Sequence, residues 1–596
     1  MNGAMKFAFI NDLAQHLSAS CGTPVTELSV ELCPPEFAGD VTVNGFLLAR
    51  QLRRNPAQIA EMVARFLSGH AEVQSAVAVK AFANITLKPA ALLRDTVSKP
   101  DELLAAVALP QEQRRRVLIE FSAPNTNKPQ HLGHVRNNSV GLATAALLAR
   151  VGHAVVRVNL INDRGIHICK SMLAYQRLGQ GATPASTGVK GDHLVGDYYV
   201  KFDAEFRRQL AALYSARPEL ADKSADELFL ETEVGRAAQD MLIAWENGDA
   251  EVRRLWETMN GWVLAGFDIT YRRMGVQFDR TYLESQTYTL GRDTIHEGLA
   301  RGVFRRREDG AIVIDFEDKN LGTKVVLRSD GTSVYVTQDI GTTLLKQHDY
   351  ESDQQIWVVG DEQIHHFNIL FAILKALGYT WADRLVHLAY GMVNLPTGKM
   401  KSREGTVVDA DDLIDEMEAL ARQATLERAG DNPPENLEER ARVIAMAALK
   451  FMLLKVSPRT TILFDPQASI TFEGDTGPYV LYAYARLSSV LRKAGAQSTE
   501  PVDWSVLGLP EERLLALRCA QYPETMQRAA ATLDTSVLAG YLLDLAKDFS
   551  RFWRSCPVLA APSAAERLAR LRLCLVVRDI LRDGLSTLTI GTLEAM

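Results

Sequence analysis

A strand, a turn with two histidines and a helix, followed by a second strand, constrain the fold of this chain more than any other feature. Residues 117–121 form a short apolar run of the kind found in buried parallel strands. The turn Lys128-Pro129-Gln130-His131-Leu132-Gly133-His134 follows, and apolar residues then recur at helical spacing up to Arg150. Residues 155–161 predict the next strand. The sequence therefore predicts a β-α-β unit with its histidines at the entrance to the helix.

The turn before this helix is suited to binding phosphate. Helix N-termini attract anions through unpaired N–H groups and the positive end of the helix dipole. His131 and His134 are three residues apart, so they are expected on one helical face, and both can donate hydrogen bonds to phosphate oxygens. Gly133 lacks a Cβ, so a flat ligand such as adenine can approach the backbone there. Because short motifs also match by chance, the turn alone only suggests a nucleotide site.

A second basic motif stands far downstream, between glycines that are typical of a loop. Lys399, Lys401 and Arg403 lie between Gly398 and Gly405. Such a loop is suited to closing over a triphosphate, and the alternative interpretation of a charged run is a solvated surface turn. In their order along the chain, the two motifs resemble the signature motifs of class I aminoacyl-tRNA synthetases.

The flanking residues narrow this resemblance to arginyl-tRNA synthetases. Residues 120–125, 330–339 and 475–486 look like the corresponding segments of that family. The resemblance implies an arginine–tRNA ligase. Such an enzyme uses ATP, with Mg²⁺, to activate L-arginine as arginyl adenylate and transfers the arginyl group to the 3′-terminal ribose of tRNA(Arg). It also implies that arginine activation requires bound tRNA.

The family's functional residues can be carried over position by position. The resemblance assigns catalysis to Lys128, His131, His134 and Lys399, ATP binding to His131, Gly133, His134, Lys399, Met400, Ser402 and Arg403, and substrate binding to Glu120, Asn125, Tyr335, Asp339 and Gln363. No residue is assigned to a metal. Glu120 and Asp339 are expected at the ends of strands, where ligands bind in open α/β sheets, and their carboxylates suit a planar guanidinium. For an isolated Asp or Asn after a strand, turn chemistry is the alternative.

The second motif departs from the commonest family pattern, Lys-Met-Ser-Lys-Ser. Arg403 stands at the usual position of the second lysine, and Lys401 stands at the usual serine position. Family members that lack the second lysine tend to place a lysine just before the histidine motif, where Lys128 lies. We therefore expect Lys128 and Lys399 to share the binding of the phosphates.

The expected fold class is α/β, with three domains. Residues 1–108 predict an N-terminal α+β domain that binds tRNA, and residues 115–454 a Rossmann-like catalytic domain with an insertion at about 164–280. Residues 455–596 predict an all-α bundle with helices at 479–493, 511–533 and 568–585. The resemblance, rather than the periodicity, makes this bundle an anticodon-binding domain.

Composition is compatible with this assignment. The formal net charge of −7 disfavours indiscriminate nucleic-acid binding, so tRNA would have to meet local basic patches, for which Arg50, Arg53 and Arg54 are candidates.

The six cysteines are scattered without a C-x-x-C pair and are expected to be reduced. No apolar run is long enough for a membrane span, and a cytoplasmic monomer is expected.

Three alternatives remain at this point. A small-molecule adenylyltransferase shares the histidine turn but needs only one compact domain. A synthetase-like tRNA-binding adaptor would lack catalysis, against which the presence of His131, His134 and Lys399 argues. A class I synthetase for another amino acid would not need the paired carboxylates of Glu120 and Asp339.

Overall fold

The centre of the molecule is a five-stranded parallel sheet with the strand order β12-β11-β5-β6-β7. The computed structural model describes residues 7–596 except positions 8, 27, 29 and 35 and segments 317–320, 397–407 and 496–500. The strands are β5 (Arg116–Glu120), β6 (Ala154–Ile161), β7 (Arg280–Leu283), β11 (Gln354–Gly360) and β12 (Leu385–Tyr390). Since β5 has the first half of the sheet on one side and β11 on the other, its carboxyl end is a switch point where ligands bind.

The predicted β-α-β unit is confirmed by β5, α6 (Leu132–Arg150) and β6. The side chains of Val117, Leu118 and Ile119 are fully buried, which explains the continuous apolar run of this strand. Helix α6 packs closely behind it, because a Cβ at Gly141 would lie 2.3 Å from Cγ of Phe121. The turn with the histidines is thereby held at the switch point.

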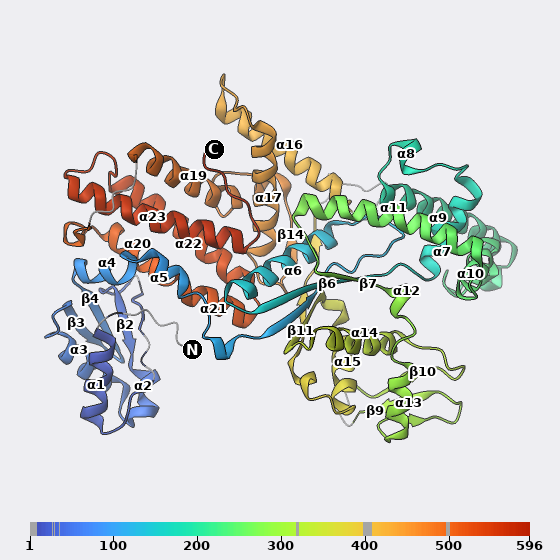
Figure 1. The fold of residues 1–596 in the computed structure, drawn as a ribbon, viewed down its shortest axis with the longest axis horizontal. Helices are drawn as coiled ribbons and strands as arrows, with labels where there is room; N and C mark the ends of the chain where they lie inside the picture. The colour runs from blue at the N-terminus through green and yellow to red at the C-terminus, as the bar shows by residue number, and fades with distance from the viewer. Residues whose placement is uncertain are drawn as a thin grey trace.

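Helices fill the segment between β6 and β7, as the sequence predicts, and extend to the right in Figure 1. They are α7 (Ile166–Leu178), α8 (Pro184–Thr187), α9 (Gly191–Ala216), η2 (Pro218–Leu220), η3 (Phe229–Glu231), α10 (Glu233–Glu246) and α11 (Ala250–Met274). A Cβ at Gly196 of α9 would lie 2.8 Å from Cδ of Pro129, so this helix packs directly against the histidine turn.

The second half of the sheet is preceded by a small antiparallel sheet, β10-β9-β8. The elements are α12 (Glu284–Thr287), α13 (Arg292–Ala300), β8 (Arg305–Arg306), β9 (Ile312–Asp315), β10 (Thr323–Leu327), α14 (Tyr335–Tyr350), η4 (Asp361–Gln363), α15 (Ile364–Ala376) and η5 (Thr380–Arg384). The expectation that Asp339 ends a strand is wrong, because it lies in α14. Val336 and Ile340 are spaced to bury one helical face, which outweighs the local strand preference of 334–337.

Beyond the sheet, helices dominate up to the C-terminus (Figure 1). The elements are β13 (Val393–Asn394), α16 (Ala410–Ala429), α17 (Leu437–Leu454), β14 (Ile462–Leu463), α18 (Pro466–Ser469), α19 (Gly477–Ala494), η6 (Trp504–Val506), α20 (Pro510–Ala520), α21 (Tyr522–Thr532), α22 (Thr535–Ser555) and α23 (Ala564–Thr587). The single helix predicted over 511–533 is two helices, α20 and α21. Pro523 cannot donate a backbone N–H and therefore stands in the first turn of a new helix.

The N-terminal residues form a separate unit with a core of its own, at the lower left of Figure 1. Its sheet has the order β1-β2-β4-β3. The elements are α1 (Phe9–Cys21), β1 (Glu31–Leu32), β2 (Val41–Asn44), α2 (Gly45–Leu52), α3 (Pro56–Leu67), β3 (Val73–Val79), β4 (Phe82–Leu87) and α4 (Pro89–Val97). The connecting elements α5 (Pro100–Ala105) and η1 (Gln111–Gln113) follow, and Leu103 and Leu104 of α5 pack against the main core. Leu517 of α20 belongs to the core of the N-terminal unit, and Arg513 of α20 pairs with Asp40. The unit is thus docked on the C-terminal helices.

All six cysteines are free thiols, as predicted. Among the described residues, no helix combines the length and the hydropathy that crossing a membrane requires.

Candidate active site

The two histidines of the turn cap α6 reciprocally. His131 is the N-cap residue, and its Nδ1 accepts the N–H of Gly133 at 3.1 Å. Nδ1 of His134 accepts the N–H of His131 at 3.2 Å. The ring centroids lie 4.0 Å apart. His131 therefore precedes the helix instead of lying on its face, but the pair is brought together as the spacing predicted.

These bonds fix which nitrogen can serve a ligand. Since each Nδ1 accepts a backbone N–H, a neutral ring carries its proton on Nε2 and donates from there. Burial and the charge of Lys128 lower the pKa of His131 to about 4. Burial, His131 and Lys128 lower the pKa of His134 well below its usual range. Both rings are thus neutral at pH 7, and each offers one N–H donor beside the helix N-terminus.

Gly133 has a second reason to lack a side chain. A Cβ there would lie 2.9 Å from Cε1 and 3.0 Å from Nδ1 of His131. The glycine therefore makes room for the capping ring, in addition to any room it leaves for a ligand.

Lys128 is half-buried next to Pro129, and none of the described carboxylates forms an ion pair with it. Its charge is available to an anion.

The connection between β5 and the histidines is strained and internally braced. Ser122 and Ala123 have φ values of 77° and 47°, in the left-handed region that side chains rarely adopt. The N–H of Ser122 donates to Oδ1 of Asn137 at 2.5 Å, and the N–H of Ala123 donates to Oδ1 of Asn159 at 3.0 Å. This brace turns the chain so that Asn125 is exposed beyond the sheet. Sequence reasoning missed it, because single asparagines in a helix and a strand carry no motif.

Glu120 ends β5 with a buried side chain that is already paired. Nζ of Lys346, on α14, donates to Oε2 of Glu120 at 2.7 Å, and Lys346 is only 2% exposed. The same ammonium lies 4.7 Å from the ring centroid of Trp357. One oxygen of the Glu120 carboxylate is thus already bound by Lys346. The sequence did not predict this pair.

Two of the other arginine-binding candidates, Tyr335 and Asp339, lie near the start of α14. Oδ2 of Asp339 lies 2.6 Å from Nε2 of His366, and hydrogen bonding to Asp339 raises the pKa of His366. Tyr335 is 77% exposed, and Gln363 and Asn125 are exposed as well. Asp339 therefore resembles Glu120 in one respect: a basic side chain holds one oxygen of its carboxylate.

The second motif lies outside the described residues, and with it Lys399, Met400, Ser402 and Arg403. The residues that follow it contact the histidine turn directly. The N–H of Leu132 donates to the carbonyl of Val408 at 2.9 Å, and the N–H of Ala410 donates to the carbonyl of Gln130 at 3.0 Å. The described chain thus resumes after the second motif directly beside the histidine turn.

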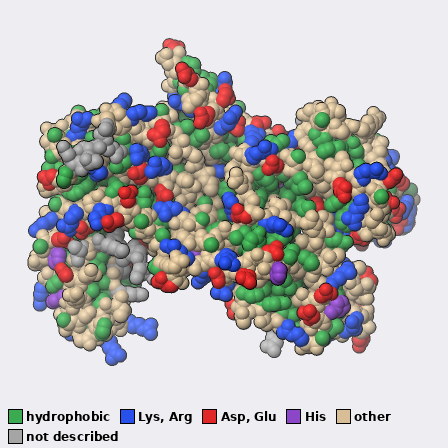
Figure 2. Space-filling model, in the orientation of Figure 1, with side chains coloured by type: hydrophobic (Ala, Val, Ile, Leu, Met, Phe, Trp, Pro, Cys, Tyr) green, Lys and Arg blue, Asp and Glu red, His purple; other side chains and the backbone are tan. Residues whose placement is uncertain are grey.

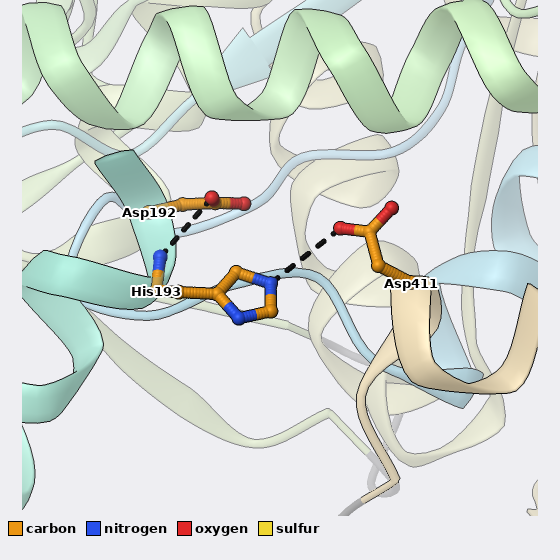
Figure 3. Close-up of side chains that lie close together, drawn as sticks. All are labelled: Asp192, His193 and Asp411. Atoms are coloured by element: carbon orange, nitrogen blue, oxygen red, sulfur yellow. Dashed lines mark hydrogen bonds and ion pairs between the residues drawn. The ribbon is translucent and has the colours of Figure 1, made fainter. Parts of the chain in front are cut away.

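Asp192 and His193 of α9 form a cluster with Asp411 of α16. Their side-chain ligand atoms lie close enough together to hold a metal ion. Figure 3 shows the ring of His193 directed at the Asp411 carboxylate. Nζ of Lys190 lies 2.8 Å from Oδ2 of Asp192 and 2.6 Å from Oδ2 of Asp411. Because an ammonium already bridges the two carboxylates, this group is an ionic tie between α9 and α16 rather than a metal site.

A family model described as "tRNA synthetases class I (R), catalytic domain" matches residues 101–465, more than half of the chain. The chain belongs to the arginyl-tRNA synthetase family. Two further family models, described as "Arginyl tRNA synthetase N terminal domain" and "DALR anticodon binding domain", match residues 8–87 and 480–596.

Named relatives agree along the whole length. The arginine–tRNA ligase of Bacteroides thetaiotaomicron is 43% identical over 588 residues, covering 96% of this chain and 97% of that protein. The arginine–tRNA ligase of Treponema pallidum is 41% identical, covering 96% and 95%. The solved arginyl-tRNA synthetase of Thermus thermophilus is 29% identical, with a TM-score of 0.78 and coverage of 99% of both chains.

Membership of the arginyl-tRNA synthetases confirms the predicted fold class. A Rossmann-like class I catalytic domain carries an inserted helical segment, an N-terminal α+β domain and a C-terminal helical domain. Of the synthetase's expected site residues, the structure gathers Lys128, His131 and His134 at the helix entrance, and it places Glu120 at the end of β5 and Asp339 in α14. Lys346 and His366, which hold the two carboxylates, were missed because pairing across the fold leaves no local pattern.

Proposed function

We propose how this site performs the reaction of its family. That reaction is the ATP-dependent ligation of L-arginine to tRNA(Arg), through arginyl adenylate and in protein biosynthesis. In the first step the arginine carboxylate attacks the α-phosphate of ATP in line, and pyrophosphate leaves. Catalysis consists of positioning and charge stabilisation, without a covalent enzyme intermediate or a side-chain general base.

The observation that carries this proposal is the reciprocal cap. It leaves Nε2–H of His131 and Nε2–H of His134 as donors at the positive end of α6, where phosphate charge is stabilised. Because both rings are neutral, they act by hydrogen bonding, and positive charge comes from lysines. Lys128 supplies it from the turn, together with Lys399 of the second motif. Gly133, Met400, Ser402 and Arg403 complete the proposed ATP-binding set.

Arginine is recognised by the carboxylates of Glu120 and Asp339. Each has one oxygen engaged by a basic side chain and one left for the guanidinium, whose donors lie in a planar fork. Tyr335 would contact the same group, and the exposed amides of Asn125 and Gln363 would hold the α-amino end.

Magnesium would arrive with ATP. The carboxylate beside the histidines, Asp409, caps α16 through Oδ1 and faces His193 with Oδ2 at 3.5 Å, so it is already engaged. Phosphate oxygens are preferred ligands of Mg²⁺, and we propose that the triphosphate supplies them. When bound, the ion neutralises part of the triphosphate charge.

In the second step, the 2′-OH of the terminal tRNA ribose attacks the adenylate carbonyl and AMP leaves. Bound tRNA is proposed to be required already for the first step. The N-terminal unit would contact the tRNA elbow, and the C-terminal helices its anticodon. We further propose that the enzyme acts as a monomer, and in the cytoplasm, where charged tRNA is consumed.

The test is ATP–pyrophosphate exchange with each of the twenty amino acids, with and without total tRNA. Exchange with arginine alone, and only in the presence of tRNA, is the expected result. Exchange without tRNA on a compound that is not an amino acid would favour an adenylyltransferase instead. Absence of exchange under every condition, with tRNA still bound, would favour a non-catalytic adaptor.

A further inference from the structure

Arg136, two residues after His134 on α6, is fully buried and binds four carbonyl groups. Its Nη1 donates to the carbonyls of Gly391 at 2.7 Å and Met392 at 3.0 Å. Its Nη2 donates to the carbonyls of Pro458 at 2.8 Å and Thr460 at 2.7 Å.

The four carbonyls belong to two segments that run side by side. Strand β13 pairs with β14 in parallel, Val393 beside Ile462. The N–H of Gly391 donates to the carbonyl of Pro458 at 2.9 Å. The guanidinium sits at the start of this pair and joins both segments to α6. Residues 391–394 lead, a few positions later in the sequence, into Lys399.

Arg136 carries a positive charge although its side chain is fully buried. Burial lowers the pKa of its guanidinium to about 10, so it stays protonated at neutral pH. None of the described carboxylates forms an ion pair with it. The groups that favour its charge are the carbonyl dipoles, the ring of Tyr390, 6.0 Å away, and the more distant charge of Asp361. Burying an unpaired cation is costly. A flat side chain of similar volume would fill the same space, so volume alone does not account for an arginine here.

The residues before and after the second motif are therefore both tied to the histidine helix. Residues 391–392 are tied by Arg136, and Val408 and Ala410 by the backbone of Leu132 and Gln130. We infer that Arg136 is a positioning residue for the activation step, fixing the segment that leads into Lys399 relative to His131 and His134. This inference rests on the phosphate-binding roles proposed above.

The position of residue 136 requires the planar guanidinium of an arginine. Two nitrogens of one rigid group reach two pairs of carbonyls, whereas a lysine ammonium is a single point with three donors. Arg136→Lys keeps the charge but cannot span both segments. A misplacement of about 1 Å in a reacting group costs on the order of 100-fold in rate. We therefore expect a loss of roughly 10- to 100-fold in kcat for arginine-dependent exchange, with an increased KM for ATP.

The matched control is Arg150→Lys. Arg150 lies on the same helix and is also an anchoring arginine, with Nε 2.8 Å from Oδ1 of Asp583 and Nη2 2.8 Å from the carbonyl of Leu104. Its partners are remote in sequence from the second motif. Arg150→Lys is expected to lower the urea midpoint while leaving kcat and the KM for ATP within about twofold.

A second variant reaches the same junction without touching the guanidinium. A Cβ at Gly391 would lie 2.7 Å from the carbonyl oxygen of Arg459, so Gly391→Ala pushes the two segments apart. It should reproduce the kinetic signature of Arg136→Lys, and it decides the matter if Arg136→Lys does not fold.

The measurement is steady-state exchange at saturating tRNA, expressed per folded protein by circular dichroism. Support requires a lower kcat and a higher KM for ATP in Arg136→Lys or Gly391→Ala, with the KM for arginine and the Kd for tRNA within about twofold. Wild-type kinetics in a folded variant, an equal loss in Arg150→Lys, or an equal rise in the KM for arginine would each overturn the inference. Wild-type protein without arginine-dependent exchange would instead overturn the proposed function.

Discussion

The two ring nitrogens of His131 face different tasks. Nδ1 accepts the N–H of Gly133 and stabilises the start of α6, while Nε2 is left for a ligand. Asparagine can imitate the first nitrogen, because its side-chain oxygen is a good N-cap acceptor. Glutamine places an amide N–H near the second. The two functions of one side chain can therefore be removed separately.

His131→Asn is expected to keep the cap and lose the donor. Its unfolding free energy should stay within about 0.5 kcal/mol of wild type, while kcat for arginine-dependent exchange falls roughly 100-fold, the usual cost of one lost charge-stabilising donor. His131→Gln should show the reverse: about 1 kcal/mol less stability, as for other lost caps, and a smaller loss of kcat. Urea unfolding and exchange kinetics measure the two effects. Equal kinetic losses in both variants would contradict the division of roles.

The lowered pKa of His131, about 4, also makes stability depend on pH. The unfolded chain binds a proton on this ring below about pH 6.5, whereas the folded protein does not until about pH 4. Stability is therefore lost as the pH falls through this window, at a rate of up to about 1.4 kcal/mol per pH unit. His131→Asn lacks this titration, so wild type should lose more stability than the variant between pH 6.5 and pH 4. Parallel curves in urea unfolding at several pH values would contradict the assignment.

At the scale of elements, charged side chains decide how the start of α16 meets the inserted helices. Burial opposes ionisation of Asp411, but the nearby His193 ring and the hydrogen bond from Lys190 hold its pKa below the ordinary range. Burial likewise lowers the pKa of His193, but Asp411 and Asp409 outweigh it and raise that pKa. Arg273 of α11 adds a bond to Asp411 at 3.3 Å. One carboxylate thus joins α9 and α11 to α16.

Asp411→Asn should therefore destabilise the protein by about 3 kcal/mol, near the lower end of the range for breaking a buried ion pair. Asp415→Asn is the matched control, since Asp415 also binds Arg273 but its side chain is 68% exposed. The control should cost about 0.5 kcal/mol or less. Urea unfolding of both variants at pH 7 provides the measurement. Similar losses in both variants would show that the buried tie contributes no more than a surface pair.

Sequence patterns predicted most of these elements because their signals are local. The apolar run of β5, the helical spacing of α6 and the apolar run of β6 depend on neighbouring residues alone. The expectation for Asp339 was wrong because packing against the core decides whether 334–340 is helix or strand. Helix 511–533 was predicted as continuous because periodicity persists across Pro523, which nevertheless begins a new helix.

At the scale of the molecule, no single sign of charge dominates the face shown in Figure 2. Figure 2 shows Lys and Arg interspersed with Asp and Glu over the face in view, in keeping with the net charge of −7. A tRNA partner therefore depends on local contacts. On the N-terminal unit, exposed Arg50 lies on α2 with Phe46, which is 61% exposed and 6.2 Å from the ring of Phe82.

Arg50→Gln is expected to weaken tRNA binding and to reduce the slope of log K against log salt by about 1, the effect of one lost phosphate contact. Arg207→Gln, an exposed arginine that pairs with Asp203 on an inserted helix, should leave the slope unchanged. Filter binding of tRNA(Arg) over a range of salt concentrations checks both. An unchanged slope in Arg50→Gln would place the tRNA elsewhere.

The candidate site could be predicted as a set of residues but not as an arrangement. His131, His134 and Lys128 are recognisable because they are adjacent in the sequence. The partners Lys346 and His366 and the brace of Asn137 and Asn159 are not, because each bond joins segments that only the folded chain brings together. The predicted domain boundaries and the predicted roles of all the site residues stay predictions.

The bond between Arg136 and Thr460 spans 324 residues of chain. A ribosome that adds about 5–20 residues per second needs roughly 15–65 s to produce the second partner after the first. During this time the histidine helix can fold, and Arg136 can bind the carbonyls of Gly391 and Met392 once they are made, but the carbonyls of Pro458 and Thr460 are still missing. Nascent protein therefore gains the full set of carbonyl partners of Arg136 only after most of its length has been synthesised.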